Sequence, residues 1–203
     1  MKPLKYLCRV ILFIVGFFTG LWVFAPWDEL GMLVFEEIRA VAANSGYYLT
    51  CLAMRREGLF PPRYTFFEMD AEGPMTKVTF RESTIDLEPL RSVLSGKAAF
   101  RMGFTDAAVR YIPNNGFSMT RGEMLVEANA ADVTLKNILI DGDLKMNGGM
   151  ILGLEDRNII ESDAVMTVPP ELNMILNMPM MGRFVESVAP GEWRIKANAA
   201  QGR

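Results

Sequence analysis

The chain has 203 residues, half of them hydrophobic, and a formal net charge of −3. It contains no histidine and only two cysteines, Cys8 and Cys51. These counts exclude catalysis and metal binding that depend on histidine. They also argue against a disulfide framework, because we expect the two cysteines to lie on opposite sides of a membrane.

The first predicted element is an uncharged apolar run over residues 10–25. A bilayer core needs about 20 residues of helix, and counting from residue 6 or 7 to residue 27 reaches that length. The basic residues of this segment all precede the run, so the positive-inside rule places the N-terminus in the cytoplasm. We therefore predict a cytoplasmic tip and single transmembrane helix over residues 1–27. The expected anchor residues are Arg9, Val10, Phe17, Trp22, Phe24 and Trp27.

A cleaved signal peptide is the alternative interpretation of the same run, because a basic start followed by a short apolar stretch is typical of one. Cleavage after Ala25 would leave Pro26 just past the cut, which is a poor context for signal peptidase. The sequence therefore favours an uncleaved anchor.

Residues 28–46 are predicted to form an amphipathic linking helix. Pro26 ends the membrane helix, Asp28 is the expected N-cap of a helix over 29–44, and Gly46 is its expected stop. Apolar residues recur at helical spacing on one face, among them Leu30, Val34 and Ile38. This face packs across one end of the following β domain, lies on the outer leaflet surface, or contacts a helix of a partner protein.

Residues 47–203 are predicted to form a periplasmic β domain, because the hydrophobic period changes there to two. Such alternation is typical of antiparallel strands with one face in water. Turn signals such as Gly73-Pro74, Asn147-Gly148-Gly149 and Pro190-Gly191 separate the strands, and a change of phase at Asn137-Ile138 predicts a bulge. We expect about eight to ten strands in a curved antiparallel sheet or meander.

Two segments interrupt the alternation and are predicted to be short capping helices. Residues 87–95 have Pro89 early and Gly96 as a stop, and residues 169–177 have Pro170 early and Pro179 beyond the end. The chain is therefore mainly β, with one transmembrane helix, one amphipathic helix and short helices at the sheet.

No catalytic, cofactor or metal site is predicted, and we expect no enzymatic activity. Asp141-Gly142-Asp143 lacks the ligand spacing of a calcium loop and is expected to form a hairpin turn. A methionine cluster follows residue 173, but methionine mostly fills apolar gaps or forms adaptable contact surfaces. We predict partner contacts at Met178, Met180 and Met181. Residues 28–203 carry a net charge of −6, because three of the 21 basic residues precede them, and this excludes nucleic acid as a partner.

The layout resembles the type II secretion system protein N (GspN-like) family over nearly the whole chain. The residues most similar to that family are Pro26-Trp27-Asp28, Leu90 to Gly96, and Gly142 to Leu144 with Gly148-Gly149. The resemblance implies a single-pass inner-membrane protein with a periplasmic β domain, an accessory part of a secretion machinery. It also implies similarity to AsmA-like proteins, whose curved sheets are linked to lipid traffic, and it supplies no catalytic residues.

Two functional hypotheses follow. The first is a non-enzymatic assembly component of a type II secretion system, with the lipid bilayer and other secretion proteins as partners. The second is a periplasmic lipid-binding or lipid-transfer module of AsmA or LptC type, in which the apolar sheet face holds acyl chains.

Overall fold

The computed structural model describes residues 12–14, 16–17, 19–20, 24, 26–44, 46–58, 62–111, 115–155 and 158–197. The chain divides into two compact units, Met1–Ile38 and Arg39–Arg203. The predicted anchor falls largely outside the described residues, and Arg9, Val10 and Trp22 are not among them. Within the described part of the chain, no helix combines the length and apolarity that crossing a membrane requires.

Helix α2, Trp27–Asn44, is the long helix expected from the sequence. Pro26 is not helical, so helical structure is interrupted at the proline, and α2 starts directly after it. Asp28 was expected to cap the helix but lies inside its first turn with Glu29, where both carboxylates favour the positive end of the helix dipole. The stop is as predicted: Gly46 has φ +82°, and its N–H donates to the carbonyl of Ala43.

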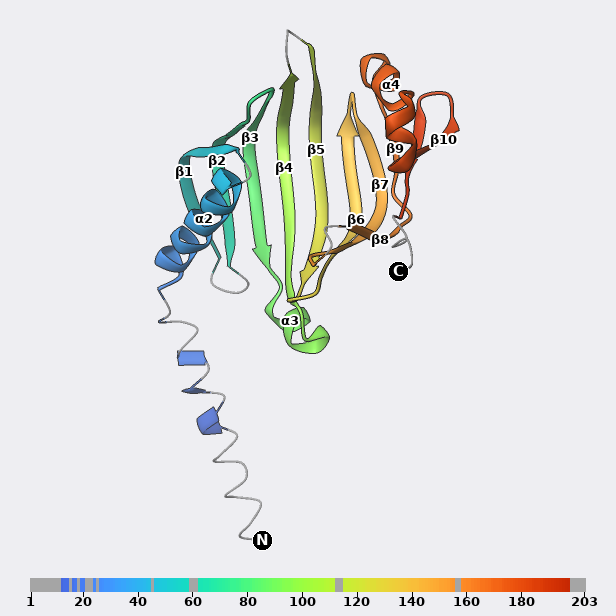
Figure 1. The fold of residues 1–203 in the computed structure, drawn as a ribbon. Coiled ribbons are helices and arrows are strands. Elements are labelled where there is room, and N and C mark those ends of the chain that lie inside the picture. Colours follow the sequence, from blue (N-terminus) through green and yellow to red (C-terminus); the bar gives the residue numbers. More distant parts are fainter. Residues whose placement is uncertain are drawn as a thin grey trace. The chain divides into compact units, whose positions relative to one another are not determined.

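The β domain is one antiparallel sheet of eleven described strands (Figure 1). The prediction of eight to ten strands was low because the last strands are too short to show a clear alternation. The strands are β1 Tyr48–Glu57, β2 Arg63–Glu72, β3 Thr76–Leu87, β4 Ala98–Tyr111, β5 Asn115–Ala128, β6 Asp132–Gly142, β7 Lys145–Gly153, β8 Asn158–Ser162, β9 Val165–Thr167, β10 Val185–Ala189 and β11 Glu192–Ile195.

The first seven strands form a meander, in which each strand pairs with the next one in sequence. The order then continues β7-β9-β11-β10, and β8 pairs with β7 alone. Strand β7 therefore has two partners on one side. Its residues Met150 to Gly153 pair with β8, and its residues Lys145 to Asn147 pair with β9.

The predicted turn at Asn147-Gly148-Gly149 is wrong, because these residues lie inside β7. The glycines lie at the point of β7 where its neighbour changes from β8 to β9. The segment that connects β8 to β9 approaches their backbone closely. A Cβ atom on Gly148, whose φ is +118°, would lie 2.7 Å from the Cα of Ala164. Close backbone approach, not a chain reversal, explains the glycines at this point.

Two short α-helices and a 3-10 helix complete the fold. Helix α3, Pro89–Ser95, connects β3 to β4 and ends at Gly96 with φ +67°, as predicted. Helix α4, Pro170–Leu176, and the 3-10 helix η1, Pro179–Arg183, lie between β9 and β10. They pack on the last strands of the sheet.

Candidate functional site

The candidate site is the apolar face of the sheet, which is built from rows of cross-strand neighbours. Residues that pair across antiparallel strands share a face. Three rows over the central strands are almost wholly apolar, and aromatic residues and methionine dominate them. They are Met69–Phe80–Ala107–Met119, Tyr64–Ile85–Met102–Met124 and Leu87–Phe100–Val126–Leu135–Met150.

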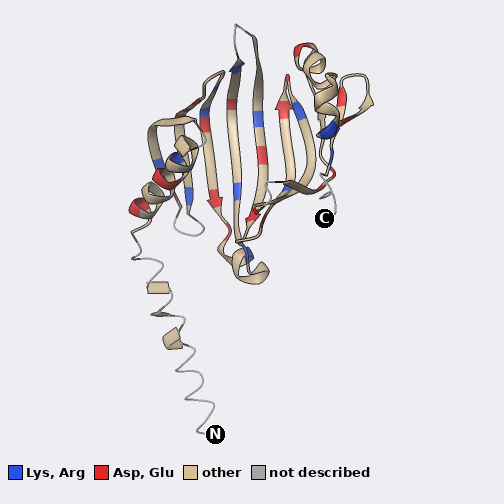
Figure 2. Cartoon of the chain, in the orientation of Figure 1, with Lys and Arg blue, Asp and Glu red and all other residues tan. Residues whose placement is uncertain are grey.

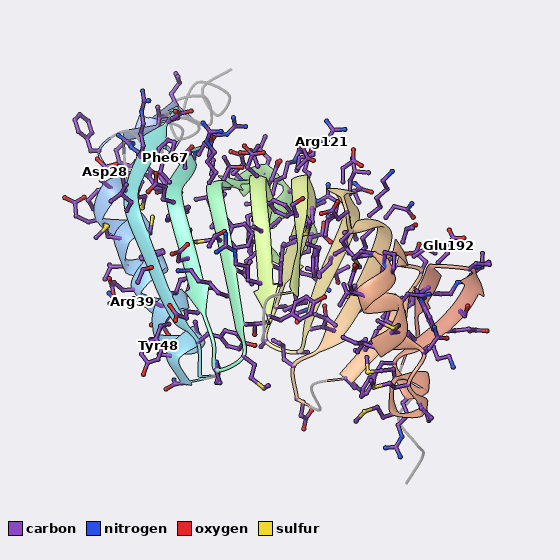
Figure 3. All side chains as sticks on the ribbon, turned by 90° about the horizontal axis from the view of Figure 1, so that it is seen from above. Asp28, Arg39, Tyr48, Phe67, Arg121 and Glu192 are labelled. Atoms are coloured by element: carbon purple, nitrogen blue, oxygen red, sulfur yellow. The ribbon has the colours of Figure 1, made fainter. Side chains whose placement is uncertain are left out.

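Among the described helices of the unit that holds the sheet, none packs on the middle of this face, and α3 contacts β4 at the β3–β4 connection. Tyr64, Phe66 and Met119 are buried, but Phe80 and Phe104 are half-buried and Met102 is exposed. Arg121 points to the opposite side of the sheet from α4 (Figure 3).

In a regular strand, every second side chain points to the same face of the sheet. Along a line that crosses the first five strands this alternation shifts by one residue, so that odd and even positions change faces there. We call this line the seam and define it by Leu52, Glu68, Arg81, Asp106 and Thr120. These positions oppose one another, and the ladder pairing is interrupted at each of them while the register on both sides is kept. Glu68 and Asp106 have φ +49°, which is unusual for residues other than glycine.

The seam separates two apolar residues that lie two apart on β2. Phe67 belongs to the row that contains Glu82, Thr105 and Arg121, across the seam from Met69. A related feature was correctly predicted on β6, where Asn137 has φ +53° and the register shifts as in a bulge.

The opposite face carries rows of polar and charged cross-strand neighbours, among them Arg63–Asp86–Arg101 and Glu82–Thr105–Arg121. Figure 2 shows that charged residues of both signs recur along the central strands. Arg63 donates from Nε and Nη2 to both carboxylate oxygens of Asp86 across the β2–β3 pair. This bidentate bond raises the pKa of Arg63. A shallow hollow of about 300 Å³ lies beside this ion pair, over Gly103 and between Arg101 and Arg121.

Glu127 on β5 is the buried acidic residue of this polar face. Its carboxylate accepts from Lys136 Nζ at 2.8 Å and from Arg91 Nε of α3. These two hydrogen bonds hold the pKa of Glu127 below its ordinary value. The side chain fastens α3 to the sheet and was not identified from the sequence, because Glu127 looks like an ordinary alternating strand residue.

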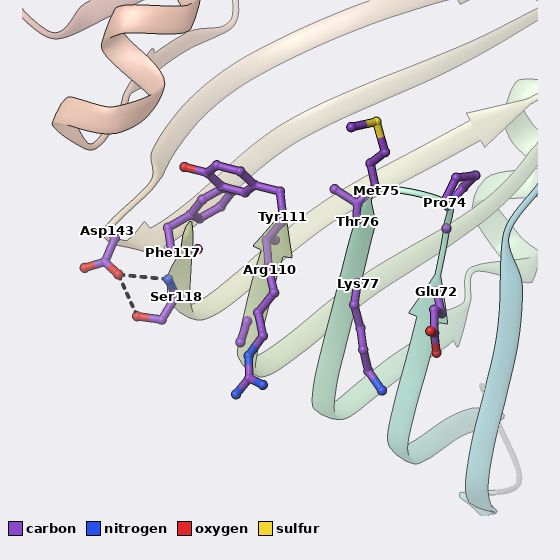
Figure 4. Close-up of a pocket in the computed structure, with 14 residues that line it drawn as sticks. Glu72, Pro74, Met75, Thr76, Lys77, Arg110, Tyr111, Phe117, Ser118 and Asp143 are labelled. Atoms are coloured by element: carbon purple, nitrogen blue, oxygen red, sulfur yellow. Dashed lines mark hydrogen bonds between the residues drawn. The ribbon is translucent and has the colours of Figure 1, made fainter. Parts of the chain in front are cut away.

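A second hollow, of about 830 Å³, lies at the hairpin ends of β2–β3 and β4–β5 (Figure 4). Met75, Tyr111 and Phe117 supply its apolar lining, and Lys77 and Arg110 supply charge. The Lys77 Nζ–Asp70 Oδ2 ion pair, 2.9 Å long, raises the pKa of Lys77. In Figure 4 the side chains of Lys77 and Arg110 point to the opposite side of the strands from those of Tyr111 and Met75.

Asp143 closes one side of this hollow. It accepts hydrogen bonds from the backbone N–H and the hydroxyl of Ser118, both 2.8 Å long, and these bonds lower its pKa. Asp143 lies in the connection between β6 and β7, next to the expected turn at Asp141-Gly142. Within the described residues, no group of acidic or cysteine side chains could hold a metal ion.

The C-terminal end of the apolar face has its own small core under α4 and η1. Trp193, Val168 and Val185 are buried there, and Met181 packs against them. The indole Nε1–H of Trp193 donates to Asn173 Oδ1 of α4 at 2.9 Å. Met181 is thus partly used inside the fold, whereas Met178 and Met180 of the predicted contact group are exposed.

The remaining predicted contact and anchor residues lie in the N-terminal part of the chain. Phe17 and Phe24 are exposed helical residues, and Trp27 is the first residue of α2. Ile38 is exposed on α2. Leu30 and Val34 belong to the same helix, but their side chains lie outside the described residues.

A comparison with known families identifies the chain. No curated protein and no solved structure matches it. A family model described as "Type II secretion system protein GspN-like, Synergistales" matches residues 4–197, nearly the whole chain. The chain therefore belongs to the type II secretion system GspN-like family.

Proposed function

We propose that the chain is a non-enzymatic accessory component of a type II secretion system. Residues 1–27 anchor it in the inner membrane with the N-terminus in the cytoplasm, and residues 47–203 lie in the periplasm. Family membership, the basic residues before the apolar run and the charge of −6 after it support this proposal.

The observation that carries the proposal is the single-layered sheet. Its edge strands are β1 and β10, and in the described part of the chain each has a partner on one side only. An unpaired edge as long as β1 is a site where another protein can add a strand. The uncovered apolar face and the open edges are therefore suited to assembly with other envelope proteins.

Affinity purification tests this assignment. The tagged full chain is extracted from its native envelope in mild detergent, with and without prior cross-linking. Secretion-system inner-membrane or periplasmic proteins are expected to co-purify, and serine at Leu30, Val34 and Ile38 is expected to reduce their recovery. Serine at the exposed Met174 serves as the control. Recovery of no secretion protein under either condition would refute the assignment.

A second candidate function, acyl-chain binding, is favoured by the uncovered middle of the apolar face. An apolar ligand would bury the half-exposed aromatic and methionine side chains there without a second protein layer. The hollow near Tyr111 and Phe117 lies at one end of the same strands.

A photoreactive fatty-acyl probe added to envelopes tests this second function. Met102→Glu places a charge on the apolar face, whereas Thr105→Glu places one on the polar face of the same strand. Both positions are exposed. We expect the probe to label the unsubstituted chain and Thr105→Glu but not Met102→Glu. Absence of labelling in the unsubstituted chain, or equal labelling of both variants, would exclude acyl binding at this face.

A further inference from the structure

Helix α3 turns its polar side to the sheet and its apolar side to water, which is the opposite of the usual orientation. An amphipathic helix on a soluble domain normally turns its apolar residues to the protein and its polar residues to water. In α3 no residue is buried, and the apolar side chains of Leu90, Val93 and Leu94 are 69%, 83% and 88% exposed. The helix lies at the turn between β3 and β4, beyond the ends of the strands (Figure 1).

Polar groups hold α3 to the sheet. Ser92 Oγ donates to the carbonyl of Glu88 at 3.0 Å and accepts the backbone N–H of Ala99 at 2.9 Å. Arg91 reaches the buried carboxylate of Glu127, and Lys97 Nζ contacts Asp132 Oδ1 at 2.6 Å. Because these bonds fix the polar side of the helix, α3 cannot turn its leucines inward without breaking them.

The size and composition of the patch argue against a protein as its main occupant. A stable protein interface buries about 800 Å² on each partner and uses about 20–30 residues a side. Three aliphatic side chains on a seven-residue helix cannot supply that area. Leucine and valine are also under-represented among the residues that dominate protein interfaces, where tryptophan, tyrosine and arginine prevail.

A bilayer places no lower limit on the area of contact, and a protruding aliphatic tip suits it. Leucine side chains enter the boundary between head groups and acyl chains, while nearby basic groups stay at the head-group level. The charged residues beside the tip are already paired, Arg91 with Glu127 and Lys97 with Asp132. The apolar side chains, and not a net charge, therefore supply the affinity for a bilayer.

We propose that α3 is a membrane-contact tip: Leu90, Val93 and Leu94 insert into the interfacial layer of a phospholipid bilayer. A single small apolar group gives only weak, reversible membrane binding, so the tip acts as a second contact that orients the β domain. The occupant is identified by its chemistry, the interfacial layer of a phospholipid surface.

Site-specific fluorescence on the full chain tests the proposal. An environment-sensitive nitrobenzoxadiazole label is attached to Leu94→Cys in a background in which Cys8 and Cys51 are serine. The protein is reconstituted in vesicles of phosphatidylethanolamine and phosphatidylglycerol. We expect a blue-shifted emission, quenching by lipids that carry a nitroxide on the acyl chain, and loss of quenching by aqueous iodide.

Two comparisons make the result specific. The same label at Met174→Cys on α4, also highly exposed, is expected to stay accessible to iodide. Adding Leu90→Ser and Val93→Ser to the Leu94→Cys protein is expected to abolish the blue shift. A label at position 94 that remains accessible to iodide overturns the proposal. A blue shift without nitroxide quenching that grows with protein density also overturns it, and assigns the patch to a second copy of the chain.

Discussion

Phe80 and Phe104 make an edge-to-face contact, with ring centroids 5.5 Å apart and ring planes at 67°. The two residues are not paired: Phe80 opposes Ala107, and Phe104 opposes Ser83. Residues three apart on an uninterrupted strand point to opposite faces, so Phe80 and Phe104 could not meet in a regular sheet. Their contact is independent evidence that both strands change phase at the seam.

Replacing Glu68 with glycine should be tolerated, because Glu68 already has a positive φ that glycine adopts easily. A glycine inside a strand normally costs about 0.5–1 kcal/mol, but at φ +49° it also relieves backbone strain of similar size. We expect the free energy of unfolding of Glu68→Gly to equal or exceed that of the unsubstituted chain, measured with urea in nonionic detergent. Glu82→Gly, one row away without positive φ, should lose about 0.5–1 kcal/mol. Equal losses in both variants would mean that the seam stores no strain.

Gly122 is required by its neighbour Phe104. A Cβ at position 122 would collide with the ring of Phe104, which is its cross-strand partner. We expect Gly122→Ala to lower the free energy of unfolding by about 1–3 kcal/mol, as overpacking does. Gly182→Ala is the control, since a Cβ there meets no atom within 4 Å. Adding Phe104→Leu should recover part of the loss, and fully additive effects of the two substitutions would contradict the collision.

Glu127 should make the stability depend on pH. Its pKa in the folded state is below its ordinary value of 4.5, so the carboxylate stabilises the fold fully above that pH. The stabilisation is lost as the pH falls below 4.5 and through the folded pKa. Glu127→Gln should lose about 1–2 kcal/mol at neutral pH and show a weaker acid dependence than the unsubstituted chain.

Glu123→Gln is the matched control for this titration. Glu123 lies on the same strand, but its side chain is exposed and its ion pair with Arg101 is 3.5 Å long. The substitution should change the free energy of unfolding by less than about 0.5 kcal/mol. If the free energy of unfolding of Glu127→Gln fell with pH as steeply as that of the unsubstituted chain, Glu127 would not be the group responsible for the acid dependence.

The hydrogen bond between Asn173 and Trp193 should stabilise the C-terminal end of the sheet. Asn173→Ala leaves the indole N–H of a side chain that is only 5% exposed without a protein partner, which costs about 1–3 kcal/mol. In a Trp193→Phe background the same substitution should cost much less, because phenylalanine has no N–H to satisfy. A double-mutant cycle by urea unfolding measures this coupling. Coupling near zero would show that the bond contributes nothing.

Local signals in the sequence predicted the C-terminal ends of α2 and α3 and the bulge at Asn137. Gly46 and Gly96 stop helices because a left-handed residue there costs glycine little, and this is a property of a few adjacent residues. The change of phase at Asn137-Ile138 likewise indicates the bulge from residues within one strand.

Features that depend on distant residues were not predicted. The role of Gly148 depends on Ala164, which approaches it only after the chain has turned back. The orientation of α3 is a similar case. Its sequence shows an apolar stripe, but the bonds of Arg91 to Glu127 and of Ser92 to Ala99 decide which side meets the sheet. The candidate site shows the same limit, since alternation indicates an apolar face but not whether anything covers it.

The strand order also has a consequence for how the domain can form. From β1 to β7 every strand pairs with the one made just before it, so the loops that must close are short and the entropic cost of each step is small. A β domain that emerges with β1 first and β11 last can add these strands one at a time. Strand β9 departs from this order, because it pairs with β7 on one side and with the later strand β11 on the other. We infer that the C-terminal end of the sheet, with Trp193 beneath α4, is completed only after the last strand has emerged.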